Sequence, residues 1–373
     1  MTINYLMNDN DLLYTLALQK AANIGDITAK KLLQHCHTAE LIFKEKDTLL
    51  QAINGIGSYI CKSLKDKKLL IDAEKELCYI KDNAIKHWYY KEDDYPKNLK
   101  HCIDGPILLF YGGQLNLKQQ HIISIVGTRN ITNYGKRICE EIIEGLSLLN
   151  PVIVSGFAYG TDITAHKAAI KNNLQTIGCL AHGMNQVYPK VHKKYMRDVE
   201  ANGGFVTEFW SSSNPERENF IKRNRIIAGI SEATLVIESA EKGGSLITAD
   251  IANSYNRDVF ALPGRIDDKF SSGTNTLIKL QRAQLVTSAA DIAYMLNWDV
   301  KQPKKPIQPK LFVDLNPSEE KIVTYLKGKD KVDLDDIAIA CQLPIHKISS
   351  TLLGLELKGV TRPHPGKQFE LIT

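Results

Sequence analysis

Residues 121–146 read HIISIVGTRNITNYGKRICEEIIEGL and decide the fold of the largest part of the chain. The apolar run at their start predicts a buried strand that ends at Gly127, and isoleucines at helical spacing follow. A sharp turn should therefore join the strand to an amphipathic helix, with unpaired backbone N–H groups at the helix start. Arg129 in that turn carries a planar cation suited to a phosphate or a base edge. A plain strand–helix connection with a surface arginine explains this stretch equally well.

The composition is that of a soluble globular protein. A chain of 373 residues exceeds one small core and indicates two or three domains. The formal charge of +5 permits a polyanionic partner without requiring one. Seven cysteines without a C-x-x-C pair favour reduced thiols in the cytoplasm over a disulfide framework or a zinc site. No N-terminal signal or membrane-spanning apolar run is visible, and no metal or cofactor is expected.

Residues 1–85 are expected to form an all-helical domain of the helix-hairpin-helix or SAM-like type. Two short turns, NIG at 23–25 and GIG at 55–57, each separate helical segments. Turns of this kind present backbone N–H groups to DNA phosphates, and lysines follow both of them. The alternative is a helical packing module that binds nothing, and the missing glycine in the first turn favours it.

Residues 86–298 are expected to form the central domain, which begins with a short connector. From residue 121 onward strands and helices alternate, which predicts a parallel sheet covered on both faces. Ligands of such sheets bind at the carboxyl ends of the strands. Five glycine-bearing turns should meet at that rim and form an anion-binding crevice: 127–129, 155–156, 183, 243–245 and 263–265.

Two further segments follow the central domain. Residues 299–312 alternate prolines with lysines and predict an extended linker. Residues 313–373 show three helices, the first capped by Ser318, and then a hairpin, which together predict a winged helix. His346 and Lys347 are the candidate DNA contacts of its recognition helix, although many winged helices contact proteins instead.

The rim of the central sheet is expected to bind a ligand without catalysing a reaction. The first turn lacks the G-x-G-x-x-G spacing of a dinucleotide site, and no Walker-type loop occurs. Ser155 stands outside a G-x-S-x-G elbow. Asp162 and His166 lie one helical turn apart, and a helix cap and a packed histidine explain them more simply than an acid–base pair. The rim therefore offers cations and hydrogen-bond donors but no paired carboxylates, so a non-enzymatic role is expected.

Cations and aromatic residues are interleaved along the same segments. This combination is typical of single-stranded nucleic-acid binding, because cations follow the backbone and aromatic rings stack on the bases. Arg223 and Arg225 are expected to be at least partly structural. The residues are Arg129, Lys190, Arg217, Lys222, Arg223, Arg225 and Arg265, with Phe157, Tyr188 and Phe220.

The chain resembles the DprA/Smf family of DNA-processing proteins. The resemblance rests on segments in the family's order and spacing: IVGTRNITNYG (125–135), SGFAYGTDITAH (155–166), HGMNQVYP (182–189), RNRIIAGIS (223–231), VIESAEKGGSLITA (236–249), VFALPG (259–264) and GTNTLIK (273–279). It implies an extended Rossmann-like domain that binds single-stranded DNA in a basic pocket. It also implies a homodimer and the loading of the RecA recombinase onto incoming DNA during natural transformation.

The residues and the resemblance together give one set of candidate DNA-binding positions. In the family pattern Arg129 is the leading cation, Lys190 follows the Tyr-Pro pair, Arg217 replaces a common lysine and Phe220 offers a stacking face. The resemblance places the dimer surface near Ile278 and Leu285. The full DNA-binding set is Gly127, Thr128, Arg129, Ser155, Gly156, Phe157, Lys190, Arg217, Phe220, Lys222, Arg223, Arg225, Gly243, Gly244 and Ser245.

Departures from the family pattern leave other functions to weigh. FIKRNR, TEFW and the longer LIKLQRAQL segment differ from the usual sequences, and the last one affects the dimer and RecA contacts. One alternative is a nucleotide-binding hydrolase resembling the lysine-decarboxylase-like phosphoribohydrolases, but the loop 242–248, KGGSLIT, lacks that group's following glutamate. Another is a transcription regulator that binds duplex DNA through the winged helix.

Overall fold

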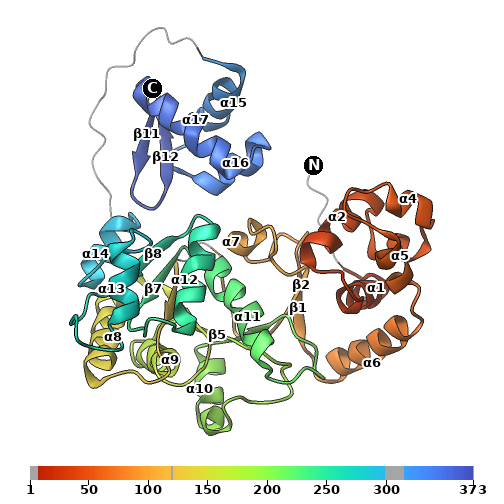
Figure 1. The fold of residues 1–373 in the computed structure, drawn as a ribbon, viewed down its shortest axis with the longest axis horizontal. Coiled ribbons are helices and arrows are strands. Elements are labelled where there is room, and N and C mark those ends of the chain that lie inside the picture. The colour runs from red at the N-terminus through yellow and green to blue at the C-terminus, as the bar shows by residue number, and fades with distance from the viewer. Residues whose placement is uncertain (1–6, 119–120, 299–314, 373) are drawn as a thin grey trace. The chain divides into compact units, whose positions relative to one another are not determined.

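A computed structural model describes residues 7–118, 121–298 and 315–372 (Figure 1). The chain divides into two compact units, Met1–Leu285 and Val286–Thr373, and each is described by itself. The predicted linker at residues 299–312 lies outside the described residues. The first unit contains an N-terminal group of helices and a large sheet, and the second contains a small winged domain.

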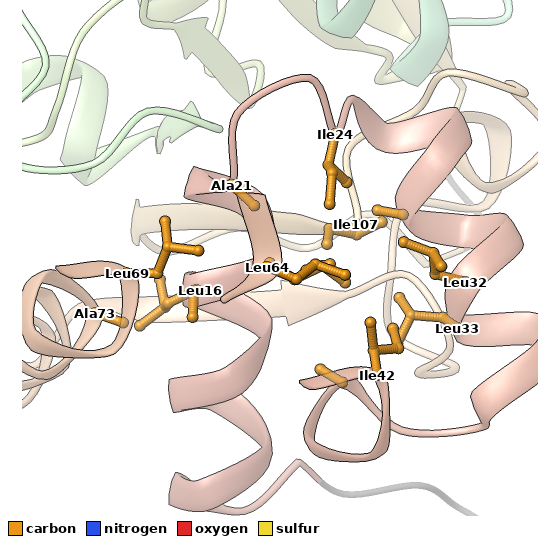
Figure 2. Close-up of a cluster of buried hydrophobic side chains, with 14 of the residues drawn as sticks. Leu16, Ala21, Ile24, Leu32, Leu33, Ile42, Leu64, Leu69, Ala73 and Ile107 are labelled. Atoms are coloured by element: carbon orange, nitrogen blue, oxygen red, sulfur yellow. The ribbon is translucent and has the colours of Figure 1, made fainter. Parts of the chain in front are cut away.

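The N-terminal helices pack around a leucine-rich core (Figure 2). Leu16, Leu32, Ile42 and Leu64 come from different helices and are buried together. Asn8 starts the first helix, because its side chain accepts a hydrogen bond from the Asp11 N–H. The helices are α1 (Asp9–Lys20), α2 (Asp26–Cys36), α3 (Ala39–Lys44), α4 (Asp47–Gln51), α5 (Ser58–Leu64) and α6 (Lys68–Asp82).

A nine-stranded sheet forms the centre of the first unit, in the order β1-β2-β6-β5-β4-β3-β7-β8-β9. The strands from β3 onward run parallel, while β1 and β2 are antiparallel additions at one edge. All five residues of β3 are buried, as expected for a strand covered on both faces. The strands are β1 (Lys86–Tyr89), β2 (Leu108–Gly113), β3 (Ile122–Val126), β4 (Val152–Ser155), β5 (Thr176–Cys179), β6 (Gly203–Thr207), β7 (Ala233–Val236), β8 (Asp258–Ala261) and β9 (Gln284–Leu285).

Helices cover both faces of this sheet. From β3 the chain moves outward through β4, β5 and β6, and later returns to β7 on the other side of β3. Right-handed crossovers in opposite directions put α8 and α9 on one face and α11 and α12 on the other (Figure 1). The helices are α7 (Lys97–Lys100), α8 (Asn133–Leu146), α9 (Thr161–Lys171), α10 (Met196–Ala201), α11 (Arg217–Ile230), α12 (Gly244–Ser254) and α13 (Ser272–Lys279), with short 3-10 turns η1 (Ser147–Leu149) and η2 (Lys190–Tyr195).

The reversal of strand order at β3 locates the ligand-binding position of the fold. In open parallel sheets a crevice forms where neighbouring crossovers leave toward opposite faces, at the carboxyl ends of the strands. Here that point lies between the carboxyl ends of β3 and β7. The turn Gly127-Thr128-Arg129 follows β3 directly, so the fold puts it at this position.

The second unit is a winged helix preceded by α14 (Ala289–Met295). Asn316 caps its first main helix, because its side chain accepts from the Ser318 and Glu319 N–H groups while Glu319 accepts from the Asn316 N–H. The prediction that Ser318 is the cap is wrong, since Pro317 already occupies the first helical position. The elements are α15 (Pro317–Leu326), β10 (Val332–Asp333), α16 (Leu334–Cys341), α17 (Ile345–Leu357), β11 (Thr361–His364) and β12 (Gln368–Leu371).

The predicted fold class is confirmed. The structure has an α/β fold with an extended, mostly parallel sheet, a helical N-terminal part and a winged helix at the C-terminal end. None of the described helices is long and apolar enough to cross a membrane.

Candidate nucleic-acid interface

The turn after β3 is held tightly against its neighbours. The Thr128 N–H donates to the Glu238 carbonyl at 2.7 Å, and the Thr128 carbonyl accepts from the Thr161 N–H at 3.1 Å. A side chain at Gly127 would overlap the Thr161 side chain, so glycine is required by this close approach. Arg129 follows at the exposed tip of the turn.

Glu238 packs against the segment that follows this turn. It was not among the residues predicted from the sequence. Its buried carboxylate accepts from the Thr132 N–H at 2.8 Å and from the Thr132 hydroxyl at 2.5 Å. The space for a side chain at Gly135 is filled by this carboxylate. The sequence did carry a signal for Glu238, namely an acidic residue soon after the apolar run of β7. A buried carboxylate in that position needs hydrogen-bond donors from a neighbouring loop.

Arg129, Tyr188 and Phe220 come together on the rim from three separate segments. The Arg129 guanidinium carbon lies 5.4 Å from the centre of the Phe220 ring. The centre of the Tyr188 ring lies 5.6 Å from the centre of the same Phe220 ring. Arg129 and Tyr188 are exposed, and Phe220 is half-buried. The rim therefore presents a cation beside two aromatic rings.

Further cations near this cluster are free for a ligand. Lys190 lies two residues after Tyr188, and Arg217 and Lys222 lie on α11 on either side of Phe220 in the sequence. All three side chains are exposed, and none has a carboxylate within ion-pair distance among the described residues.

Arg223 also approaches Phe220, at 5.8 Å, but it is buried. Its guanidinium donates to the Gly156 and Cys179 carbonyls, each at 2.5 Å, and so ties the ends of β4 and β5 together. The side chains of Arg223 and Asp162 both approach Gly156 so closely that they leave no space for a Cβ atom. Burial raises the pKa of Asp162 and lowers the pKa of Arg223, and their mutual attraction opposes both changes.

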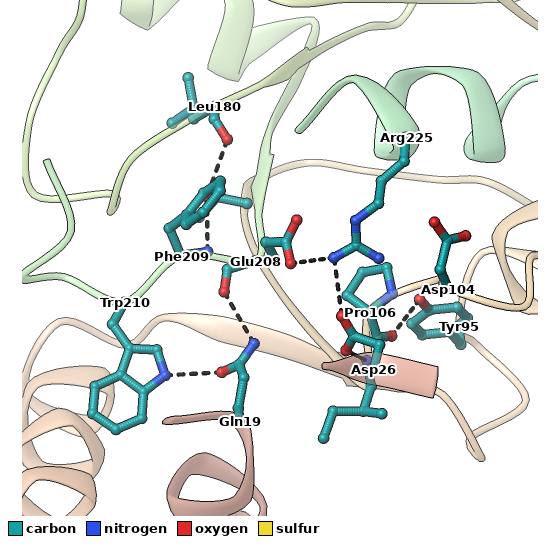
Figure 3. Close-up of polar contacts among 12 residues, drawn as sticks. Gln19, Asp26, Tyr95, Asp104, Pro106, Leu180, Glu208, Phe209, Trp210 and Arg225 are labelled. Atoms are coloured by element: carbon teal, nitrogen blue, oxygen red, sulfur yellow. Dashed lines mark hydrogen bonds and ion pairs between the residues drawn. The ribbon is translucent and has the colours of Figure 1, made fainter. Parts of the chain in front are cut away.

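Arg225 takes part in a different contact. It pairs with Glu208 and, at 3.0 Å, with Asp26, and both carboxylates are mostly shielded from solvent (Figure 3). Asp26 also accepts from the Ile107 N–H at 2.8 Å. Arg225 thus joins α11 to the start of α2 and does not approach Phe220 as Arg129 and Arg223 do.

The remaining rim residues from β4 and its loop are buried. The Ser155 hydroxyl donates to the Ile125 carbonyl at 2.7 Å. Phe157 is 0% exposed and has a φ of 58°, which turns its ring inward against His166, His192 and Phe205. As placed, the Phe157 ring packs in the core and leaves no face open to a base.

The glycine segment at the start of α12 is partly open. Gly244 is exposed with no atom near its Cβ position, whereas a side chain at Gly243 would overlap the Ser239 hydroxyl. Ser245 is buried, and its hydroxyl donates to Ser239 at 2.9 Å. The Arg265 side chain pairs with Asp267 at 2.9 Å.

The two predicted dimer residues lie at the β9 side of the sheet. Leu285 is 46% exposed on β9, at the edge of the sheet, and Ile278 on α13 is half-buried against the core.

Two titratable groups close to the rim, Asp162 and His166, are buried and hydrogen-bonded. His166 Nδ1 lies 2.7 Å from the Thr176 hydroxyl, and burial lowers the pKa of His166 to about 3, so the ring is neutral near pH 7. The Asp162 carboxylate accepts from the Ala158 N–H at 3.2 Å. Ala158 precedes α9, so Asp162 binds the loop before the helix and does not cap the helix itself. Among the described residues, no three histidine, cysteine or acidic side chains gather as a metal site.

The two N-terminal hairpins differ in their surroundings. Lys30, after the first turn, donates to the Cys102 and Ile103 carbonyls, and burial lowers its pKa. The second turn is exposed at Gly55 and Gly57, with only the Lys31 ammonium near Gly55. The first hairpin is therefore engaged in packing within this unit.

These features define an extended Rossmann-like protein with a basic, aromatic rim and a winged helix. Comparison with known families is specific: the chain belongs to the DNA recombination-mediator protein A family, DprA/Smf, whose profile matches residues 86–297. The DprA winged helix domain profile matches residues 303–367. The family predicted from the sequence is thereby confirmed.

Relatives in this family cover most of the chain. Protein Smf from Escherichia coli K12 is 33% identical over 303 residues, covering 80% of this chain and 80% of that protein. The DNA processing protein DprA from Streptococcus pneumoniae is 40% identical over 202 residues, covering 54% of this chain and 71% of that protein.

Solved structures agree with the fold. The X-ray structure of S. pneumoniae DprA superimposes with a TM-score of 0.63 at 30% identity, over 77% of this chain and 98% of that one. The Helicobacter pylori DprA structure, described for its single-stranded DNA binding mode, gives a TM-score of 0.51 at 27% identity, over 56% of this chain and 93% of that one.

Proposed function

We propose that this protein is a single-stranded DNA-binding recombination mediator. In this proposal it protects incoming single strands and loads RecA onto them during natural transformation, as the family resemblance implies. The observation that carries the proposal is the cluster of Arg129, Tyr188 and Phe220 on the rim. The H. pylori relative, described as binding single-stranded DNA, supports the choice of ligand.

The geometry supports a single strand over a duplex. Bases of a single strand are free to stack on exposed rings, at about 1–3 kcal/mol per base, and its phosphates need nearby cations. Tyr188 and Phe220 offer the rings, and Arg129, Lys190, Arg217 and Lys222 offer the cations. In a duplex the bases are already stacked on each other, so the rings would gain no such contact.

A binding role without catalysis is part of the proposal. Glu238 and Asp162, two acidic side chains near the turn after β3, are buried and accept hydrogen bonds from the protein itself. The competing hydrolase hypothesis predicts release of free base from nucleoside monophosphates, and such release by purified protein would replace the present proposal.

We further propose a cytoplasmic homodimer. The cysteines are free, and six of the seven are buried, which suits a reducing compartment. Ile278 and Leu285 are the proposed dimer residues, and exposed Leu285 on an edge strand is open to a second copy.

A titration of single-stranded and duplex oligonucleotides by fluorescence anisotropy tests the binding proposal. We expect preference for the single strand, and a loss of about tenfold in affinity in Arg129→Ala. The slope of log affinity against log salt should also fall by about 0.7, the value for one phosphate contact on a single strand.

Arg137→Ala is the matched control, because Arg137 is an exposed arginine on α8 that already pairs with Glu141 at 2.7 Å. Unchanged affinity in Arg129→Ala, or equal affinity for duplex, would refute the binding proposal. Formation of RecA filaments on strands coated with the protein then tests the mediator role separately.

A further inference from the structure

A second group of cations and tyrosines lies beyond the rim, on α9, the loop before it and η2. We call it the outer patch: Tyr159, Lys167, Lys193, Lys194 and Tyr195. Tyr159 is 44% exposed, Tyr195 is half-buried and the three lysines are exposed. None of these residues was among the positions predicted from the sequence.

A buried histidine lies next to both aromatic rings of the outer patch. His192 Nδ1 donates to the Phe157 carbonyl at 3.0 Å. The His192 ring centre lies 5.1 Å from that of Tyr159 and 6.0 Å from that of Tyr195. The His192 ring therefore lies next to the rings of both tyrosines.

Two lysine side chains lie close to the Tyr195 ring. The Lys194 ammonium lies 5.0 Å from the Tyr195 ring centre, and the Lys167 ammonium lies 5.8 Å from it. Among the described residues, no carboxylate lies within ion-pair distance of Lys167, Lys193 or Lys194. Asp198 and Glu200 on neighbouring α10 pair with none of them. By contrast, Lys44, Lys75 and Lys81 each pair with a carboxylate.

The outer patch is continuous with the rim through two connections. Gly160, next to Tyr159, packs so closely against the Arg129 backbone that a side chain there would overlap it. Lys190, beside the rim cluster, begins η2, the same short turn that contains Lys193, Lys194 and Tyr195. The outer patch therefore adjoins two cations of the rim, Arg129 and Lys190.

We propose that the outer patch is a second binding segment for the same single strand. Tyr159 and Tyr195 stack on bases that leave the rim, and Lys167, Lys193 and Lys194 bind the phosphates between them. Unpaired cations alternating with aromatic rings are what a sequence-tolerant single-strand track requires. This inference rests on the proposed function, because it extends the ligand of the rim.

The test compares two oligothymidylates, of about 6 and about 20 nucleotides, on the full chain. We expect wild type to bind the longer one more tightly. The variant Lys167→Gln/Lys193→Gln/Lys194→Gln should lose that gain and keep its affinity for the shorter one. Its salt slope for the longer strand should fall by about 2, the value for three phosphate contacts.

Lys44→Gln/Lys75→Gln/Lys81→Gln is the matched control, since it changes the net charge equally at lysines that already have partners. The inference is overturned if wild type binds both lengths equally, if the outer-patch variant loses both lengths alike, or if the control variant gives the same loss. Failure of the rim itself is seen separately, as unchanged binding of the shorter strand in Arg129→Ala.

The contribution of Tyr159 to binding of the longer strand is measured separately. Tyr159→Ala should weaken binding of the longer strand about tenfold and leave the salt slope unchanged, because stacking releases no counterions. A thermal melt confirms that the variant is folded. Unchanged affinity for the longer strand would remove Tyr159 from the segment.

Discussion

Arg129 and Arg223 lie near the same phenylalanine ring but have different surroundings. Arg129 is exposed and its guanidinium lies beside Phe220, whereas Arg223 is buried and donates to the carbonyls at the ends of β4 and β5. The sequence predicts a cation at both positions. It cannot decide which cation is buried, because that depends on carbonyl groups far away in the chain that the sheet brings together.

The burial of Phe157, an aromatic residue, was likewise not predictable from the sequence. Its place directly after Ser155-Gly156 at a strand end made it a candidate for stacking. Its positive φ turns the ring into the core, and this rare backbone conformation for a bulky residue has no clear sequence signal. Arg129, Lys190, Arg217 and Lys222 are exposed, as a surface ligand requires. The position of Arg129 was the most predictable, because it lies in a short turn directly after the buried strand β3.

Replacing Arg223 separates a positioning residue from a phosphate contact. Arg223→Met should lower the free energy of unfolding by about 3 kcal/mol, because it leaves buried carbonyls and Asp162 without their cation. It should also weaken single-strand binding while the salt slope stays that of wild type. Arg129→Met should also weaken binding, but it should leave the free energy of unfolding nearly unchanged and reduce the salt slope by about 0.7.

Urea unfolding and anisotropy titrations at several salt concentrations measure both quantities on the same proteins. A reduced salt slope in Arg223→Met would show that this buried arginine reaches a phosphate after all.

Two hairpins with similar sequences have different surroundings in the fold. The first is docked, because Asp26 at the start of α2 accepts from the Ile107 N–H and pairs with Arg225. The second keeps exposed glycines before α5. The turns themselves are predictable from their glycines and flanking helices. The docking is not, since Asp26 and Arg225 are nearly two hundred positions apart in sequence.

Removing the carboxylate at Asp26 tests how much this docking stabilises the first unit. Asp26→Ala leaves the Ile107 N–H without its acceptor and Arg225 with one carboxylate fewer, which should cost about 1–3 kcal/mol of unfolding free energy. Asp47→Ala is the control, because its pair with Lys65 is exposed and should contribute less than about 1 kcal/mol. Chemical denaturation measures both, and an equal effect of the two substitutions would argue against a docking role for Asp26.

Charge is unevenly distributed over the whole molecule. Residues 7–85 contain 11 cationic and 11 anionic side chains, and residues 315–372 contain 8 of each, so the excess of positive charge lies outside these two modules. On α17, the predicted recognition helix of the winged domain, His346 and Lys347 are exposed together with Leu353 and Leu357. The fold of the winged domain was predictable from its order of elements, but its surface chemistry does not follow from that fold.

This distribution predicts that nucleic-acid affinity of the full chain depends on the central sheet and little on the winged helix. Binding to DNA phosphates requires an excess of cations near the strand, and a module with balanced charge releases few counterions. The variant His346→Gln/Lys347→Gln should therefore bind single strands and duplex DNA within about twofold of wild type, since these two side chains are expected to make no phosphate contact. Arg129→Ala should reduce single-strand binding in the same titration. If the winged-helix variant instead lost sequence-specific duplex binding, the winged helix would be the main DNA-reading element and a regulator of transcription would be the better description.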